Sequence, residues 1–177
     1  MLFRSEVFYP NPTADSWNLS LEQLIDGWRL IYPDNPLKIV ELGVQALDGD
    51  YKTLQNKVWA EHEINEKGMI FTTKWGKGLG LETTNDEIIH QGQKQGYVVV
   101  VRKDPKKGYL RIKTLPKPEI DLTPVYEKLS ALEPEATWYL HPSKHMLLNG
   151  STHNPDMRPT KKKLEEIIEV IKEVLCK

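Results

Sequence analysis

The sequence predicts an α+β fold: a helical N-terminal part packed on a small mixed sheet, with a C-terminal helix covering the sheet. Three observations predict this fold. Apolar residues recur at helical spacing through the first third of the chain, a valine-rich segment and an alternating segment flank a turn, and residues 164–175 carry a broad apolar stripe. The expected parts are a helical part at 1–68 and an α+β part at 69–177, which can also form one continuous domain.

The first part of the chain reads as three helices. Residues 20–23 match a capping box, so the first helix begins there and ends before Pro33. Asn35 followed by Pro36 starts a second helix, which the Asp-Gly-Asp run at 48–50 breaks before a third over 51–65. The apolar residues of the second helix are spaced as one buried face: Leu37, Val40, Val44 and Leu47.

The middle of the chain predicts strands. Residues 69–75 read as a strand, and the glycine-rich run at 76–80 reads as a loop. After a short helix within 86–95, four consecutive valines mark a strand at 97–102 that is covered on both faces. The turn at 104–108 then leads to an alternating strand, so 97–113 is expected to form a β-hairpin.

The last part mixes helices and loops. We expect a helix over 124–132, a short strand over 138–141 and a long loop over 142–160, before the closing amphipathic helix. The predicted sheet therefore has four strands, at 69–75, 97–102, 109–113 and 138–141. A loop of this length in a compact domain is often functional.

Composition and charge limit the classes of function. The chain has an ordinary soluble composition, no apolar run long enough for a membrane span and one cysteine, Cys176, so we expect a cytoplasmic protein without disulfides. The net charge is −1, yet residues 97–118 hold 7 basic side chains and 1 acidic one. This local charge of +6 favours an anionic ligand. The alternative is a lysine-rich hairpin whose charges prevent edge pairing.

Two segments supply the candidate ligand-binding residues. The basic strands offer guanidinium and ammonium groups for a phosphate, and the 145–154 loop offers hydrogen-bond donors and acceptors around a glycine that permits close backbone approach. The candidates on the basic strands are Arg102, Arg111 and Lys113, and those in the loop are His145, Asn149, Gly150, Ser151, His153 and Asn154.

The same loop admits two alternatives. Three histidines and a carboxylate could hold zinc or manganese and form a self-contained metal-dependent hydrolase. The residues of that alternative are His141, His145, His153 and Asp156. The other alternative is a non-catalytic interaction domain, in which the hairpin and the loop line no common pocket.

The second half of the sequence resembles the C-terminal, DHH-associated substrate-binding region of DHH-family phosphoesterases. The branch that it resembles most is that of the metal-dependent exonucleases named for melanocyte proliferation. The resemblance is carried by a hairpin containing RIK (111–113), a helix beginning DLTPVYEKL, the strand segment WYLHPSKH, the loop LLNGSTHNP and the helix LEEIIEVIKEVL.

The resemblance implies binding of a phosphate-bearing ligand, a nucleotide or an RNA end. In that family a glycine-rich loop with a histidine and a nearby basic residue hold the substrate, and these match Asn149, Gly150, Ser151, His153 and Arg111. The family's metal-binding aspartates and Asp-His-His motif have no counterpart here. The resemblance therefore implies no catalytic residue and no cofactor in this chain, with manganese or another divalent metal held by a separate catalytic DHH-type domain.

Overall fold

The computed structural model describes residues 20–151, 154 and 156–175. Its contacts divide the chain into two compact units, Met1–Gln55 and Asn56–Lys177. The second unit joins helices to one six-stranded mixed sheet, which confirms the predicted α+β class. No helix of the described part has both the length and the apolar character needed to cross a membrane.

Two helices begin where the sequence predicts. The first, α1 (Leu21–Ile31), starts after Ser20, whose hydroxyl accepts a hydrogen bond from the Gln23 backbone N–H. The second, α2 (Pro36–Lys67), starts after Asn35, whose side chain accepts from the Lys38 N–H. Each of these bonds satisfies one of the backbone donors that a helix N-terminus leaves without a partner.

The predicted break at 48–50 is wrong, because α2 runs through it as one helix of 32 residues. Glycine weakens a helix by only about 1 kcal/mol, which the flanking turns can offset. The expectation that Leu37, Val40, Val44 and Leu47 form a buried face is also wrong, since all four are more than half exposed. Only the last turns of α2, in the second unit, bury apolar side chains, those of Ala60 and Ile64.

The six strands lie in the order β1-β2-β3-β4-β6-β5, and every neighbouring pair is antiparallel except β2 with β3. The predicted hairpin is confirmed as the pair β3 and β4. The strand bounds are β1 Met69–Thr73, β2 Gly76–Glu82, β3 Val99–Lys103, β4 Leu110–Thr114, β5 Trp138–Leu140 and β6 Met146–Asn149.

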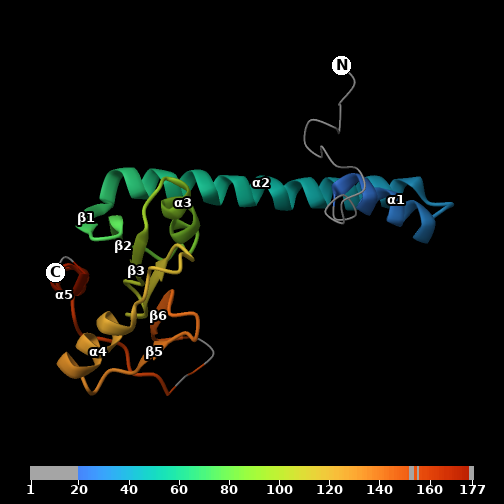
Figure 1. The fold of residues 1–177 in the computed structure, drawn as a ribbon. Helices are drawn as coiled ribbons and strands as arrows, with labels where there is room; N and C mark the ends of the chain where they lie inside the picture. Colours follow the sequence, from blue (N-terminus) through green and yellow to red (C-terminus); the bar gives the residue numbers. More distant parts are fainter. Residues whose placement is uncertain (1–19, 152–153, 155, 176–177) are drawn as a thin grey trace. The chain divides into compact units, whose positions relative to one another are not determined.

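Helices cover the two faces of the sheet unequally (Figure 1). On one face, α4 (Thr123–Leu132) and α5 (Leu164–Leu175) pack over the larger apolar core, as the predicted covering helix requires. On the other face, α3 (Ile88–Lys94) and the last turns of α2 pack over a smaller core that ends at Val100 of β3. On that second face, the side chains of β4, β5 and β6 remain accessible to solvent.

Two segments expected to be loops are strands. The glycine-rich run at 76–80 forms most of β2, because Gly78 lies against the ring of Phe71 and Gly80 lies against Ile168 of α5. These glycines allow close packing rather than a flexible loop. The predicted loop at 142–160 contains β6, which pairs with both β4 and β5.

We predict that Gly78→Ala lowers the free energy of unfolding by about 1–3 kcal/mol, because the added methyl group would overlap the buried Phe71 ring. Ile70→Ala, at an exposed position of β1, is the control and should change it by less than about 1 kcal/mol. Urea unfolding measures both. Equal effects of the two variants would contradict the packing of β2.

Candidate functional site

The accessible part of the second sheet face carries the predicted basic side chains. Arg102 is paired with Arg111 across β3 and β4, and Lys113 is paired with Val100. Because strand side chains alternate between faces, all three basic residues lie on the α3 side of the sheet. Beyond Arg111 on the same face come Leu148 of β6 and then Tyr139 of β5.

Arg102 is a charged side chain enclosed by the fold, with only 7% of its surface exposed. One terminal nitrogen (Nη2) donates to the Thr84 carbonyl at 3.0 Å and lies 3.4 Å from Asp104. The other (Nη1) lies 2.9 Å from Asp86. The Nε atom is buried and has no hydrogen-bond partner. Burial of an arginine is costly unless its donors are satisfied, and this donor is left unpaired.

Asp86 connects the two arginines. Its Oδ1 atom lies 2.9 Å from Arg102 Nη1 and 3.5 Å from Arg111 Nη1. The Asp86 side chain is 60% exposed, on the turn between β2 and α3, and the Arg111 side chain is 39% exposed. Two guanidinium groups therefore already hold one carboxylate oxygen at a solvent-accessible position, an arrangement that also suits a phosphate oxygen.

A pocket of about 370 Å³ opens between these arginines and the end of β6. The loop side of the pocket is formed by Gly150 and Ser151. Gly150 has a φ of +87°, and a side chain there would overlap the ring of Tyr109, so glycine is required by both backbone and packing. The remaining lining residues are Thr84, Asp86, Arg102, Asp104, Lys107, Tyr109, Leu110, Arg111 and Leu148.

A second pocket of about 300 Å³ adjoins the first, and the two share Asp86 and Arg111. It extends along β4 to Lys113 and Met146, and on its other side it reaches His90 of α3. The two pockets together form one groove along β4, with Arg111 at its middle. We call this the β4 groove.

Asp104 fixes the position of Arg102. Partial burial raises the pKa of this carboxyl, but the backbone N–H groups of Lys107 and Lys106 and the charge of Arg102 outweigh that and lower the pKa below its usual value. Its Oδ1 atom accepts from both N–H groups, at 3.0 and 2.8 Å. The ionised carboxylate thus holds the 104–108 turn and the buried guanidinium together.

The structure brings part of the predicted site together. Arg102, Arg111, Gly150 and Ser151 line the same pocket, and Lys113 lies in the adjoining one. Sequence spacing could not show this, because about forty residues separate the hairpin from the loop; the pairing of β4 with β6 joins them.

Asn149 has a structural role instead of the predicted ligand contact. Its side chain is fully buried, and its amide nitrogen donates to the carbonyl oxygens of Thr137 and Arg158 at 3.0 and 3.2 Å. Its carbonyl oxygen accepts from the Thr160 N–H. These bonds tie β5 and the chain before α5 to the end of β6, so the carboxamide is not directed at a ligand.

The other predicted loop residues lie elsewhere. The His145 ring lies 3.4 Å from the hydroxyl of Thr114, whose side chain points to the α4 and α5 face, so His145 is on the side of the sheet opposite Arg111. Asn154 is exposed and bridges to Ser151 through the backbone. His153 lies outside the described residues.

The metal alternative gains no support in the described part of the chain. There, no three histidine, cysteine, aspartate or glutamate side chains come together as ligands would. The Nδ1 atom of His141 lies 2.8 Å from the Ser143 hydroxyl oxygen. The His145 ring is directed at Thr114. His153, the remaining histidine of this alternative, lies outside the described residues.

The sequence reasoning missed several residues of the β4 groove, above all Asp86 and Asp104. The Asp-Pro pair at the start of the 104–108 turn is a turn signal, and an aspartate there commonly accepts from the following N–H groups. No signal in the sequence indicated Asp86, since only the tertiary fold brings the turn before α3 to β4.

No family model matches the sequence, and no curated protein matches it.

We predict that Asn149→Ala lowers the free energy of unfolding by about 2–4 kcal/mol, because the Thr137 carbonyl and the buried Thr160 N–H lose the partner that the Asn149 side chain supplies. Asn154→Ala, at an exposed position of the same loop, should change it by less than about 0.5 kcal/mol. Chemical unfolding of the two variants checks this. A neutral Asn149→Ala would contradict the structural role.

We predict that Asp104 stabilises the fold at neutral pH and loses this effect in acid. Its pKa in the folded state is below the unfolded value of 3.8, so its contribution is complete above that pH and disappears as the pH falls through the folded pKa. Asp104→Asn should therefore be less stable than the parent at pH 7, with a difference that shrinks below about pH 4. Unfolding curves between pH 2 and 7 measure this difference, and one that stays constant over the range would contradict the prediction.

Proposed function

We propose that the β4 groove binds a phosphate-bearing ligand, a nucleotide or an RNA end. The observation that carries the proposal is the pair of guanidinium groups that converge on the exposed Asp86 carboxylate, beside a buried Arg102 Nε without a partner. In this proposal a phosphate oxygen takes the place of, or lies next to, the Asp86 oxygen. The bidentate geometry of arginine fits such an oxyanion.

The surroundings of Arg111 support a nucleotide rather than a free inorganic ion. Leu148 and Met146 flank Arg111 and Lys113 on the same sheet face, and the half-exposed ring of Tyr139 follows beyond Leu148. A flat apolar strip next to two cations offers a base or a ribose a contact surface while the phosphate is held by charge. Lys107 adds a fourth positive charge, beside those of Arg102, Arg111 and Lys113, at the other end of the groove.

In this proposal the β4 groove binds the substrate and takes no part in the chemical step. The resemblance to the substrate-binding region of DHH-family phosphoesterases leads to the same proposal, in which a separate catalytic DHH-type part with its divalent metal carries out the hydrolysis. In that arrangement the groove positions the phosphate, and no residue of this chain is assigned a catalytic step.

Isothermal titration with adenosine 5′-monophosphate tests the proposal, with adenosine as the ligand that lacks the phosphate. Arg111→Gln should weaken binding about 10- to 100-fold, the effect of losing a charge-assisted contact. Asp86→Asn should strengthen it, because a carboxylate that competes for both arginines is removed. Binding by the parent chain should also weaken as salt is added.

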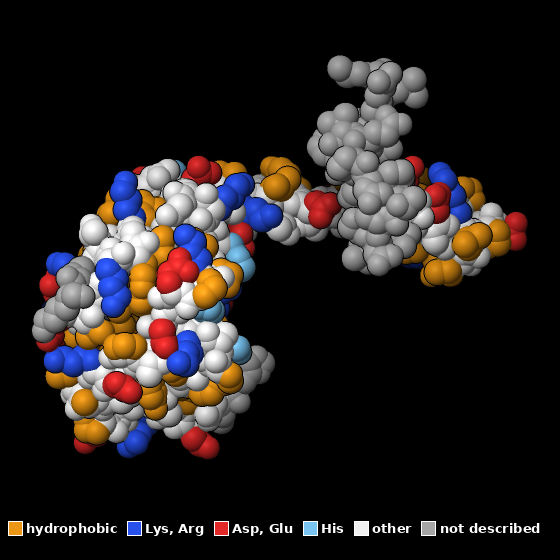
Figure 2. Space-filling view, in the orientation of Figure 1, with side chains coloured by type: hydrophobic (Ala, Val, Ile, Leu, Met, Phe, Trp, Pro, Cys, Tyr) orange, Lys and Arg blue, Asp and Glu red, His pale blue; other side chains and the backbone are white. Residues whose placement is uncertain are grey.

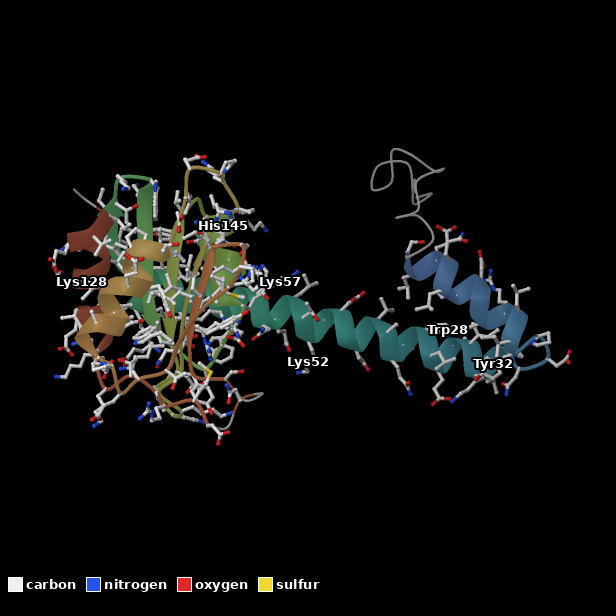
Figure 3. All side chains as sticks on the ribbon, turned by 60° about the horizontal axis from the view of Figure 1, so that its bottom comes forward. Trp28, Tyr32, Lys52, Lys57, Lys128 and His145 are labelled. Atoms are coloured by element: carbon white, nitrogen blue, oxygen red, sulfur yellow. The ribbon has the colours of Figure 1, made fainter. Side chains whose placement is uncertain are left out.

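The matched control is Lys128→Gln on α4, which removes a positive charge from the covered side of the sheet (Figure 3). This variant should bind as the parent does. Equal affinity of the parent, Arg111→Gln and Asp86→Asn for the nucleotide would overturn the proposal.

A further inference from the structure

The first unit displays an apolar stripe along α2 that nothing in its described part buries. Six side chains, at alternating spacings of three and four residues, are each 53–81% exposed. Figure 2 shows apolar side chains at the surface of this part of the chain. The stripe consists of Leu37, Val40, Val44, Leu47, Tyr51 and Leu54, and the same spacing continues in the sequence to Val58.

The described part of this unit has no apolar core of its own. Among residues 20–55 the buried side chain is Ser20, and every apolar side chain of α1 remains at least partly exposed (Figure 3 labels Trp28 and Tyr32). Short helices without buried apolar area are marginal in water, because packing supplies most of a helix's stability. The described residues of the unit therefore leave the stripe available to a partner.

We infer that the stripe pairs with the same stripe of a second copy of this chain, as a parallel two-stranded coiled coil. Spacings of three and four are the a and d positions of a heptad repeat, with Leu37, Val44 and Tyr51 at a. Leu47 and Leu54 fall at d. A β-branched residue at a with leucine at d, as in Val44 and Leu47, favours two strands over three or four.

The charges beside the stripe favour the parallel, in-register arrangement over the antiparallel pairs that keep most of the stripe in contact. In that arrangement Asp48 lies across from Gly43 of the second copy, and Asp50 lies across from Gln55, so no like charges meet. In an antiparallel pair centred near residue 49, Asp48 would face Asp48 of the second copy and Asp50 would face Asp50, so like charges would meet. Shifting that pair by one layer would place Glu41 against Asp48.

The exposed area matches what a stable dimer buries. The six side chains of the stripe expose on the order of 650 Å² per chain, so a symmetric pair would cover about twice that, within the roughly 1,200–2,000 Å² of standard specific interfaces. The stripe is also larger than the roughly 300–600 Å² that is the largest apolar patch on a typical monomer.

Sedimentation equilibrium of the full chain tests the pairing. The parent should have twice the mass of the 20.5 kDa chain. The double variant Leu47→Glu, Leu54→Glu should have half the parent's mass, because it places charges in two apolar layers. The control Gln45→Glu, Thr53→Glu adds the same charges on exposed positions away from the stripe and should remain dimeric. A monomeric parent would overturn the inference.

Cysteine cross-linking tests the parallel register and does not depend on a disruptive variant. In a background with Cys176→Ser, Val40→Cys should form a disulfide-linked dimer in mild oxidant, because parallel in-register pairing brings position 40 next to its own copy. Gln45→Cys, on an outward position, should not. Absence of the Val40→Cys link in a protein of dimeric mass would contradict the parallel pairing.

Discussion

The buried guanidinium of Arg102 is the interaction on which the functional surface depends. A charge with so little exposed surface is tolerated only when its donors meet acceptors. Two segments supply acceptors to Arg102: the turn before α3 through Thr84 and Asp86, and the 104–108 turn through Asp104. Satisfying Arg102 therefore also brings Asp86 to Arg111. The Nε donor of Arg102 is buried and has no partner.

The unequal covering of the sheet explains why this surface is accessible at all. Two helices pack over the larger core on one face, whereas α3 and the end of α2 bury the other only as far as Val100. The next strand in the sheet, β4, carries Arg111 and Lys113 where a covered strand would carry apolar residues. The core on the opposite face stabilises the sheet. The side chains of the β4 groove can therefore remain accessible to a ligand.

Local signals predicted much of the fold. The capping residues Ser20 and Asn35 fixed both helix starts, and the valine run and the 104–108 turn predicted the hairpin, because these features act within a few residues. The errors arose where distant contacts decide. In the sequence Gly78 has the character of a loop residue, but in the fold the Phe71 ring packs on it within a strand. Residues 146–149 likewise carry no strand signal, and pairing with β4 and β5 makes them a strand. The stripe of α2 was expected to be buried because its apolar residues recur at helical spacing, yet these residues are exposed in a single chain.

The candidate site divides in the same way. Charge and alternation indicated Arg111 and Lys113, but residue type alone could not distinguish Gly150, which lines the pocket, from Asn149, which is bonded inside. The most direct measurement is an NMR titration that follows the arginine Nε–Hε signals as adenosine 5′-monophosphate is added. Binding in the β4 groove predicts that the signals of Arg102 and Arg111 shift together and saturate, while that of Arg29 on α1 stays in place. Signals of Arg102 and Arg111 that do not move would contradict it.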